Sequence, residues 1–423
     1  MTEQPTAYGG NSRTSWALPR VGVFDHLSAD RGGSQLVVAR MVSVLSRKCS
    51  VELIHGGQGY TLPDLEAAFG VDLGRARERI VPDSGRSFAV PGERSIGWYL
   101  RQGLRYDRAL TEPYDVFVYS GHGVPPVSSA GAALVYCHFP KEAHPEVELG
   151  SAPQWQRRSG LSRRIRMASY CYLWRRRMRG YRRILANSSF TASWIERFWG
   201  NRAVVIYPPV SLQAQHRPKH NLIVSIGRFD PRDGKNVGAQ LEAFPRFLSQ
   251  VGEGWSLCMI GFCANIGEER KYMDMLRERA RGLPVTFMVN ADRGTVLRCL
   301  GEAKLFWHSR GLAALGNESL PAWRMEHFGV ATVEAMMAGC VPLVPANGGQ
   351  PEIVQHRRSG FLCHDVGALI AHSVELANDD ELRARMSSMA ADRSLAFRSE
   401  VFDRGVLEEV RQSLSTGAHV LAG

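Results

Sequence analysis

Short apolar runs alternate with longer amphipathic segments along the chain, and this alternation constrains the fold more than any other feature. It is the pattern of β-α-β units, in which each strand of a parallel sheet is followed by a helix that covers it. The runs fall into two groups, separated by a polar stretch at 211–220. The predicted strands are 20–25, 50–54, 115–119, 132–137, 183–187 and 203–207 in the first group, and 221–226, 256–260, 284–288, 304–308, 341–345 and 360–363 in the second.

The 423 residues are enough for two domains that each bury their own core. We therefore predict an α/β protein with two Rossmann-like domains, whose parallel sheets face a central cleft. The predicted parts are a disordered tail at 1–18, an N-terminal Rossmann-like domain at 19–210, a linker at 211–220, a C-terminal Rossmann-like domain at 221–395, and a C-terminal helix at 396–423 that packs back on the N-terminal domain.

Composition excludes several classes of protein. With 44% hydrophobic residues the chain is too apolar to be disordered, and no uncharged run approaches the roughly 20 residues of a membrane-spanning helix. The first residues lack the basic patch and apolar core of a secretory leader, so we expect a cytoplasmic protein. The eight cysteines are scattered singly without zinc-ligand spacing, which predicts no metal site.

The segment 157–183 carries eleven arginines, and no acidic residue occurs between Glu148 and Glu196, so this segment accounts for the whole net charge of +11. Arginine binds phosphate groups, and the interleaved aromatic residues favour a bilayer interface, so we interpret the segment as a surface for an anionic membrane or an acceptor. A solvated helix face, internal ion pairing and a nucleic-acid surface are the alternatives. We predict no nucleic-acid partner, because no recognised nucleic-acid-binding motif accompanies the patch. The residues assigned to the membrane or acceptor surface are Trp174, Arg175, Arg176 and Arg177.

Residues suited to phosphate binding follow the first strand of the second group. Arg228 comes directly after this strand, and Lys235 lies seven positions further on, across a loop turned by Pro231 and Gly234. Two cations at the carboxyl end of a parallel strand suit a diphosphate. Two solvated surface charges are the alternative interpretation.

The segment E-H-F-G-V-A-T-V-E, residues 326–334, places two carboxylates eight positions apart. On one continuous helix they would point about 80° apart, so a loop followed by a helix fits better. We predict that Glu326 lies in the loop, that the helix begins near Gly329, and that Glu334 lies about one turn into it. The free N–H groups at the start of such a helix attract phosphate, and carboxylates suit sugar hydroxyls.

Two candidate segments lie in the first half of the chain. Gly32 and Gly33 form a tight turn before a predicted helix at 34–46, so that backbone N–H groups can approach an anion. An ordinary strand-to-helix turn is the alternative. His138 ends a strand in V-Y-C-H-F-P, where it faces the predicted cleft, and a structural histidine is the alternative.

Together these segments resemble the retaining glycosyltransferases of family 4, which have the GT-B fold and use nucleotide-diphosphate sugars. The resemblance covers roughly residues 20–400 and is most specific in E-H-F-G-x-x-x-x-E-A-M-x-A-G-x-x-P, N-G-G-Q-P-E-I-V and S-G-F-L. V-Y-C-H-F-P, A-N-S-S-F-T and Y-P-P-V are similar to segments of mannosyltransferases that extend lipid-linked oligosaccharides. The resemblance implies GDP-mannose as the favoured donor, a glycan or polyprenyl-diphosphate-linked acceptor, and a place at the cytoplasmic face of a membrane.

The resemblance also implies domain and residue roles: the domain at 19–210 would be the acceptor side, and the domain at 221–395 would bind the nucleotide sugar. Glu334 would bind the ribose hydroxyls of the donor, while Glu326 and the backbone at 328–330 would hold the transferred sugar and the distal phosphate. The catalytic residues would be His138, Glu326, Arg228 and Lys235, and the donor-binding residues Gly32, Gly33, Arg228, Lys235, Phe328, Gly329, Val330 and Glu334. Two features depart from the family pattern: Gln35 stands where many members carry Glu, and fifteen residues, Gly311 to Met325, form a long connection before Glu326.

No D-x-D motif occurs in the chain, so we predict a transferase that needs neither a metal nor a cofactor and stabilises the leaving diphosphate with fixed positive charge. Retention is implied by the family and allows two routes. We prefer same-face attack, with Glu326 orienting sugar hydroxyls, to a covalent intermediate on Glu326. A nucleotide-sugar epimerase of the same fold and a non-catalytic nucleotide- or nucleic-acid-binding module are the alternative functions.

Overall fold

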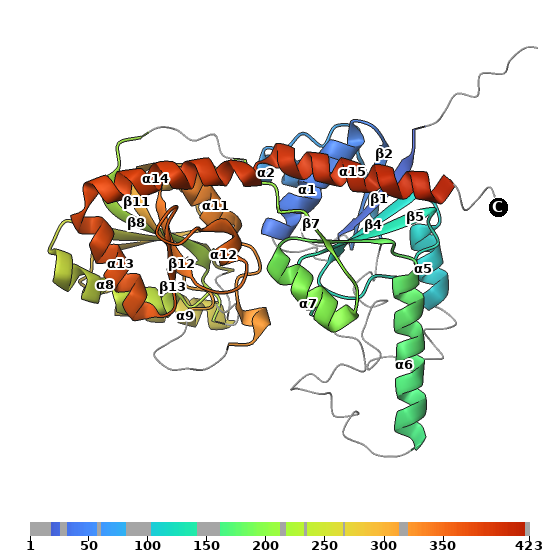
Figure 1. Cartoon of the computed structure of the whole chain (residues 1–423), viewed down its shortest axis with the longest axis horizontal. Helices are drawn as coiled ribbons and strands as arrows, with labels where there is room; N and C mark the ends of the chain where they lie inside the picture. The colour runs from blue at the N-terminus through green and yellow to red at the C-terminus, as the bar shows by residue number, and fades with distance from the viewer. Residues whose placement is uncertain are drawn as a thin grey trace, which may run out of the picture.

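A computed structural model of the protein describes residues 18–25, 32–56, 61–81, 103–141, 161–211, 217–231, 235–264, 267–312 and 320–418. The predicted tail lies outside these ranges except for Leu18, and so do residues 212–216 of the predicted linker. Two sheet-containing domains lie side by side, with α14 (Asp380–Ser394) on the C-terminal domain and α15 (Ser399–Ala418) on the N-terminal domain (Figure 1).

The N-terminal domain is built on a parallel sheet, as predicted. In the described part of the chain this sheet has seven strands in the order β3-β2-β1-β4-β5-β6-β7. The strands are β1 (Arg20–Asp25), β2 (Ser50–His55), β3 (Arg77–Ile80), β4 (Val116–Gly121), β5 (Ala132–Cys137), β6 (Arg183–Ala186) and β7 (Val204–Val205). All but β3 overlap a predicted strand.

The C-terminal domain has a second parallel sheet. Among the described residues it has six strands in the order β10-β9-β8-β11-β12-β13, and each of them overlaps a predicted strand. The strands are β8 (His220–Arg228), β9 (Ser256–Phe262), β10 (Val285–Val289), β11 (Ala303–Trp307), β12 (Val341–Pro345) and β13 (Phe361–Cys363).

Helices cover the faces of both sheets. Those of the N-terminal domain are α1 (Gly33–Ser46), α2 (Leu62–Phe69), α5 (Leu104–Thr111), α6 (Leu161–Arg179) and α7 (Ser189–Trp199). The C-terminal part of the chain contains α8 (Val237–Val251), α9 (Gly267–Arg279), α10 (Arg293–Glu302), η3 (Ala322–Arg324), α11 (Val330–Met337), α12 (Gln350–Ile353), α13 (Val366–Asn378), α14 (Asp380–Ser394), η4 (Leu395–Phe397) and α15 (Ser399–Ala418).

Side-chain caps determine where several helices begin. The side chain of Ser188 accepts a hydrogen bond from the backbone N–H of Thr191 at the start of α7, and Asp292, Asp365 and Asp379 make the equivalent bond for α10, α13 and α14. Such a bond satisfies one of the N–H groups that the first turn leaves without a partner inside the helix.

The C-terminal helix α15 belongs to the core of the N-terminal domain. Phe402, Val406 and Val410 are buried there among residues of α1 and of the strands β1, β4 and β5. The guanidinium of Arg40 on α1 donates to both carboxylate oxygens of Asp403, at 2.8 and 2.6 Å. The helix is therefore held on the N-terminal domain by apolar packing and by a bidentate ion pair.

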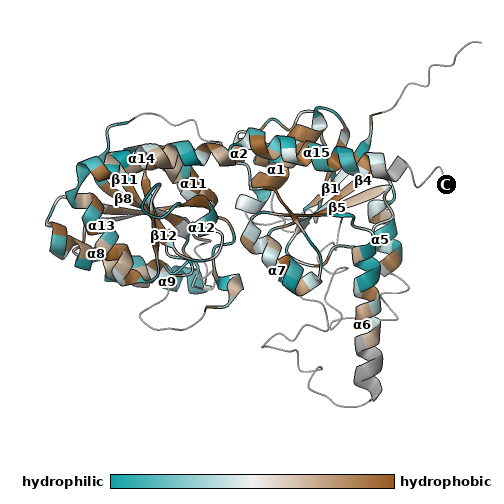
Figure 2. Cartoon of the chain, viewed as in Figure 1, coloured by the Kyte–Doolittle hydropathy of each residue, from teal (hydrophilic) through white to brown (hydrophobic). Residues whose placement is uncertain are grey.

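Apolar residues are concentrated on the strands and on the faces of the helices that cover them (Figure 2). None of the helices in the described ranges is both long enough and apolar enough to cross a membrane.

Candidate active site

The predicted phosphate-binding residues lie where the carboxyl ends of the two sheets approach each other. Arg228 is the last residue of β8, and Gly32 and Gly33 lie at the start of α1 in the other domain. A Cβ atom on Gly32 would lie 3.6 Å from Nη2 of Arg228, and one on Gly33 would lie 3.4 Å from Cγ2 of Val330. The structure thus brings the Gly-Gly turn, Arg228 and the first residue of α11 together across the two domains.

Lys235 and Glu326 form an ion pair in the C-terminal domain. Lys235 Nζ donates to Glu326 Oε2 at 2.8 Å, and Nε2 of His308 lies 3.2 Å from the same oxygen. Burial alone would raise the pKa of Glu326, but Lys235, His308 and Arg310 hold it well below its usual range. Glu326 is therefore ionised, with Lys235 donating to it and the His308 ring nitrogen close to the same oxygen.

His308 was not among the predicted site residues, although it ends the predicted strand at 304–308. It lies just after β11 and is buried. Burial lowers its pKa, and this effect outweighs the opposing attraction of Glu326. A polar residue directly after a buried parallel strand was the signal that could have identified it.

The loop-then-helix arrangement of 326–334 matches the prediction. Gly329 is the N-cap of α11 and has φ of 121°, and a Cβ atom there would lie 2.7 Å from Nε2 of Gln350. Only glycine fits this position without displacing its neighbours. The side chain of Phe328 is buried against Tyr207 and Phe397, so it is the backbone of this segment that is available for a ligand.

Glu334 lies in α11 and is engaged by an arginine that the sequence did not indicate. Its Oε1 atom lies 2.6 Å from Nη2 of Arg293, the first residue of α10. The arginine comes from a separate element, so nothing in the local sequence pattern pointed to this pair. A ribose hydroxyl would have to share the carboxylate with Arg293.

His138 is buried directly after β5. Its Nε2 lies 2.9 Å from Ser120 Oγ, and its carbonyl accepts a hydrogen bond from Asn187 Nδ2 at 2.9 Å. Burial lowers the pKa of His138 to about 3, so the ring is neutral at physiological pH. The next residue, Phe139, stacks on His327 of the C-terminal domain with ring centroids 4.0 Å apart. The predicted catalytic residues adjoin this stacked pair in the sequence. His138 directly precedes Phe139, and Glu326 directly precedes His327.

A carboxylate of the C-terminal domain caps a helix of the N-terminal domain. Glu352 accepts hydrogen bonds from the backbone N–H groups of Ser189 and Phe190, both at 2.7 Å, and from the hydroxyl of Tyr207 at 3.1 Å. Beside it, Ser188 Oγ donates to the carbonyl of His327 at 2.6 Å. These contacts hold the two domains together next to Glu326.

Helix α6 carries part of the arginine-rich segment and extends away from the N-terminal sheet (Figure 1). Arg175 and Arg176 are exposed, as a binding surface requires. The assignment of Trp174 and Arg177 to that surface was wrong. Trp174 packs edge-on against Trp199, and both Trp174 and Arg177 are buried, because a helix that rests on a sheet turns part of its circumference inward.

Arginines at the end of the segment have mixed surroundings. Arg183 forms an ion pair with Glu409 of α15 at 3.4 Å and donates to Gln412, whereas Arg179 and Arg182 are exposed. Internal pairing, which was an alternative interpretation of the whole segment, therefore applies to Arg183. The positions 157 and 158 lie outside the described residues.

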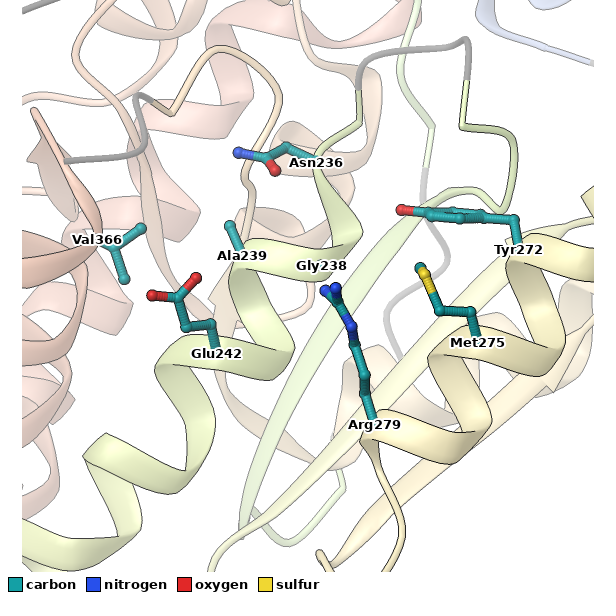
Figure 3. Close-up of a pocket in the computed structure, with 8 residues that line it drawn as sticks. All are labelled: Asn236, Gly238, Ala239, Glu242, Tyr272, Met275, Arg279 and Val366. Atoms are coloured by element: carbon teal, nitrogen blue, oxygen red, sulfur yellow. The ribbon is translucent and has the colours of Figure 1, made fainter. Parts of the chain in front are cut away.

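A cavity of about 300 Å³ lies between α8, α9 and α13. Tyr272 and Arg279 from α9 and Glu242 from α8 line it (Figure 3). None of the predicted site residues lines this cavity, although Asn236, the residue after Lys235, does.

Within the described ranges, no group of three or more His, Cys, Asp or Glu side chains is arranged to hold a metal ion. Metal independence and the lack of a cofactor remain predictions.

Residues 211–393 match the family model described as glycosyl transferases group 1. The GDP-Man:Man(3)GlcNAc(2)-PP-Dol alpha-1,2-mannosyltransferases of Mus musculus and Homo sapiens are similar to this chain, with 29% identity over 233 residues and 30% over 234 residues. Each match covers 49% of this chain and 44% of the relative, so the chain spans less than half the length of these relatives.

Solved structures resemble the chain over most of its length. Anabaena HepE in complex with UDP-glucose has a TM-score of 0.62 and 15% identity, with 93% of this chain and 100% of that chain covered. WaaG, a glycosyltransferase involved in lipopolysaccharide biosynthesis, has a TM-score of 0.59 and 14% identity over 91% of this chain and 98% of that chain. The predicted GT-B fold is confirmed.

The neutral, buried state of His138 predicts a pH dependence of stability. Its pKa is about 3 in the folded protein and about 6.5 when unfolded, so below pH 6.5 the unfolded state binds more protons. The free energy of unfolding should fall with decreasing pH by about 1.4 kcal/mol per pH unit for this residue. Between pH 7 and 5, denaturant unfolding should therefore show a smaller loss of unfolding free energy for His138→Asn than for the wild type. The control is His220→Asn, at the exposed first residue of β8. An equal change in the slope of unfolding free energy against pH for this control would contradict the prediction.

The interdomain cap at Glu352 predicts that Glu352→Ala weakens the contact between the domains. Two backbone N–H groups and one hydroxyl lose a charged acceptor, which should cost about 1 to 3 kcal/mol. Calorimetry should show a lower melting temperature, and small-angle scattering a larger radius of gyration. Glu381→Ala, on the exposed surface of α14, is the matched control. An unchanged radius and melting temperature for Glu352→Ala would show that the contact does not hold the domains.

Proposed function

We propose that this chain, which carries a glycosyltransferase group 1 domain in a GT-B fold, transfers mannose from GDP-mannose to a lipid-linked glycan. The observation that carries the proposal is the arrangement of Lys235, paired with Glu326 at 2.8 Å, beside Arg228 and the start of α11, opposite the Gly-Gly turn of the other domain. The similar proteins are GDP-Man:Man(3)GlcNAc(2)-PP-Dol alpha-1,2-mannosyltransferases, which supports the choice of donor and acceptor.

The leaving diphosphate is bound by positive groups that are already in place. Arg228 and Lys235 supply two cations from one connection, and the first turn of α11 supplies backbone N–H groups and the positive end of a helix dipole. Gly32 and Gly33 allow the opposite backbone to approach the same phosphates. Preorganised charges of this kind stabilise charge that develops in a transition state, and no metal ion is required for it.

Glu326 orients the transferred sugar. Because it is ionised and held by Lys235, it can accept hydrogen bonds from sugar hydroxyls next to the anomeric carbon. The reaction retains the anomeric configuration by same-face attack, in which the departing phosphate takes the proton of the acceptor hydroxyl. Glu334 binds the ribose, and His138, kept neutral by burial, lies on the acceptor side.

The protein acts at the cytoplasmic face of an anionic membrane. Arg175, Arg176 and Arg179 are exposed on α6, and the half-exposed ring of Tyr172 accompanies them. Anionic lipid attracts clustered basic residues, and a lipid-linked acceptor lies at the same surface.

Lys235→Ala should lower the turnover of mannose transfer about a hundredfold or more, because one fixed positive charge at the leaving diphosphate is lost. The measurement is transfer from GDP-mannose in the presence of EDTA, with UDP- and ADP-sugars compared and with NMR of the donor alone to detect epimerisation. Lys271→Ala, on the exposed face of α9, is the control. A change under threefold for Lys235→Ala would place this residue away from the diphosphate, and complete loss of wild-type activity in EDTA would contradict metal independence.

Replacing Arg175 and Arg176 by alanine should reduce cosedimentation with vesicles that contain anionic lipid, and the difference should shrink at high salt. The control is the double variant Arg270→Ala and Arg277→Ala on α9, which removes the same charge from another exposed surface. Equal binding by both double variants would show that net charge, and not α6, governs the association.

A further inference from the structure

The residues that follow β11 contact both members of the Lys235–Glu326 pair. His308 Nε2 lies 3.2 Å from Glu326 Oε2, while Ser309 Oγ donates to the backbone carbonyl of Lys235 at 2.7 Å. Gln240 Nε2 in turn donates to Ser309 Oγ at 2.8 Å. Two consecutive residues thus contact the two members of the ion pair. His308 lies against the carboxylate of Glu326, and Ser309 holds the backbone of Lys235.

We infer that His308 is a positioning residue of the donor site, whose neutral ring donates from Nε2 to Glu326 and keeps this carboxylate aligned with Lys235. This inference rests on the proposed function for its consequences in catalysis. It names a residue that acts through Glu326 and does not itself touch the donor.

The protonation of the ring follows from its partner. An ionised carboxylate only accepts hydrogen bonds, so the nitrogen that faces it must carry the hydrogen. His308 is 4% exposed, and the charged groups around it are Glu326, Lys235 and Arg310. Burial and the two cations oppose a positive charge on the ring and outweigh the attraction of Glu326, so the ring is neutral and donates from Nε2.

The alignment between His308 and Glu326 is incomplete in this structure. Nε2 of His308 is buried, and it makes no well-directed hydrogen bond to any of the described residues. Contacts of this kind are often long in a free enzyme and tighten when the substrate is bound. A donor that draws Lys235 toward its diphosphate would leave His308 as the remaining protein group that restrains the carboxylate.

The first experiment compares His308→Gln with His308→Leu. Glutamine can place an N–H near the position of Nε2, whereas leucine has a similar volume and no donor. We expect His308→Gln to stay within about threefold of the wild type in kcat/KM, and His308→Leu to fall about tenfold or more, which is the size typical of residues that orient an active-site group. His308→Asn, which is polar but too short to reach, should behave like His308→Leu and replaces it if that variant does not fold.

The pH profile separates positioning from proton transfer. A positioning role predicts the same profile for His308→Gln and the wild type, because the role needs an N–H donor near Glu326 and no proton transfer by residue 308. If His308→Gln is as slow as His308→Leu, or if its profile loses a limb, the inference is overturned. The control is His372→Leu: His372 on α13 forms a His–Glu pair of the same 3.2 Å separation with Glu375, away from the donor site.

A second measurement does not depend on transfer. GDP binding by His308→Leu should weaken relative to the wild type, and this effect should vanish in a Glu326→Gln background, because the histidine acts through the carboxylate. Additive effects of the two substitutions would overturn the inference. If the wild type binds GDP but transfers no mannose, the proposed function fails while this cycle still tests His308. If the wild type binds no nucleotide, the cycle is measured with the melting temperatures of the wild type, His308→Leu, Glu326→Gln and the double variant. Additive changes in melting temperature would again overturn the inference.

Discussion

The rest of the site depends on the interactions of one ionised carboxylate, that of Glu326, which is largely shielded from solvent. Removing a carboxylate from water costs several kcal/mol, and only well-placed partners offset that cost. Lys235 and His308 are these partners, and they come from the connections that follow β8 and β11. A single charge therefore fixes the relative positions of three segments at the carboxyl edge of the sheet. This edge of the C-terminal sheet therefore carries charged groups that already hold one another in place.

Most of the fold could be predicted, because buried parallel strands are short apolar runs in the sequence itself. Each strand of the C-terminal sheet and all but one of the N-terminal sheet were found in this way. The missed strand, β3, reads R-E-R-I and is mostly exposed at the edge of its sheet. It is a strand because its backbone pairs with β2, which no local apolar pattern reveals. The start of α11, in contrast, could be predicted from a local signal. Gly329 has a backbone conformation that only glycine tolerates easily, and a glycine at this position is visible in the sequence.

The site was predictable to the extent that its residues stand at strand ends and helix starts. Arg228, Lys235 and Glu326 were found by this rule, and His308 obeys it too. Arg293 and Glu352 act through partners far away in the sequence, so their roles depend on tertiary structure. The sequence also did not show which side chains of α6 face the interior of the protein. The segment contains arginines and aromatic residues on all sides, and it is contact with the sheet that buries Trp174 and Arg177.

The N-terminal domain cannot complete its core until the C-terminal domain has been synthesised. Phe402, Val406 and Val410, which cover one face of its sheet, belong to α15, which follows the C-terminal domain in the sequence. At about 5 to 20 residues per second, roughly 20 to 75 s separate the appearance of β1 from that of α15. During this interval the face of β1, β4 and β5 that α15 covers lacks these side chains. Completion of the first core is therefore coupled to synthesis of the second domain, which lies between β1 and α15 in the sequence.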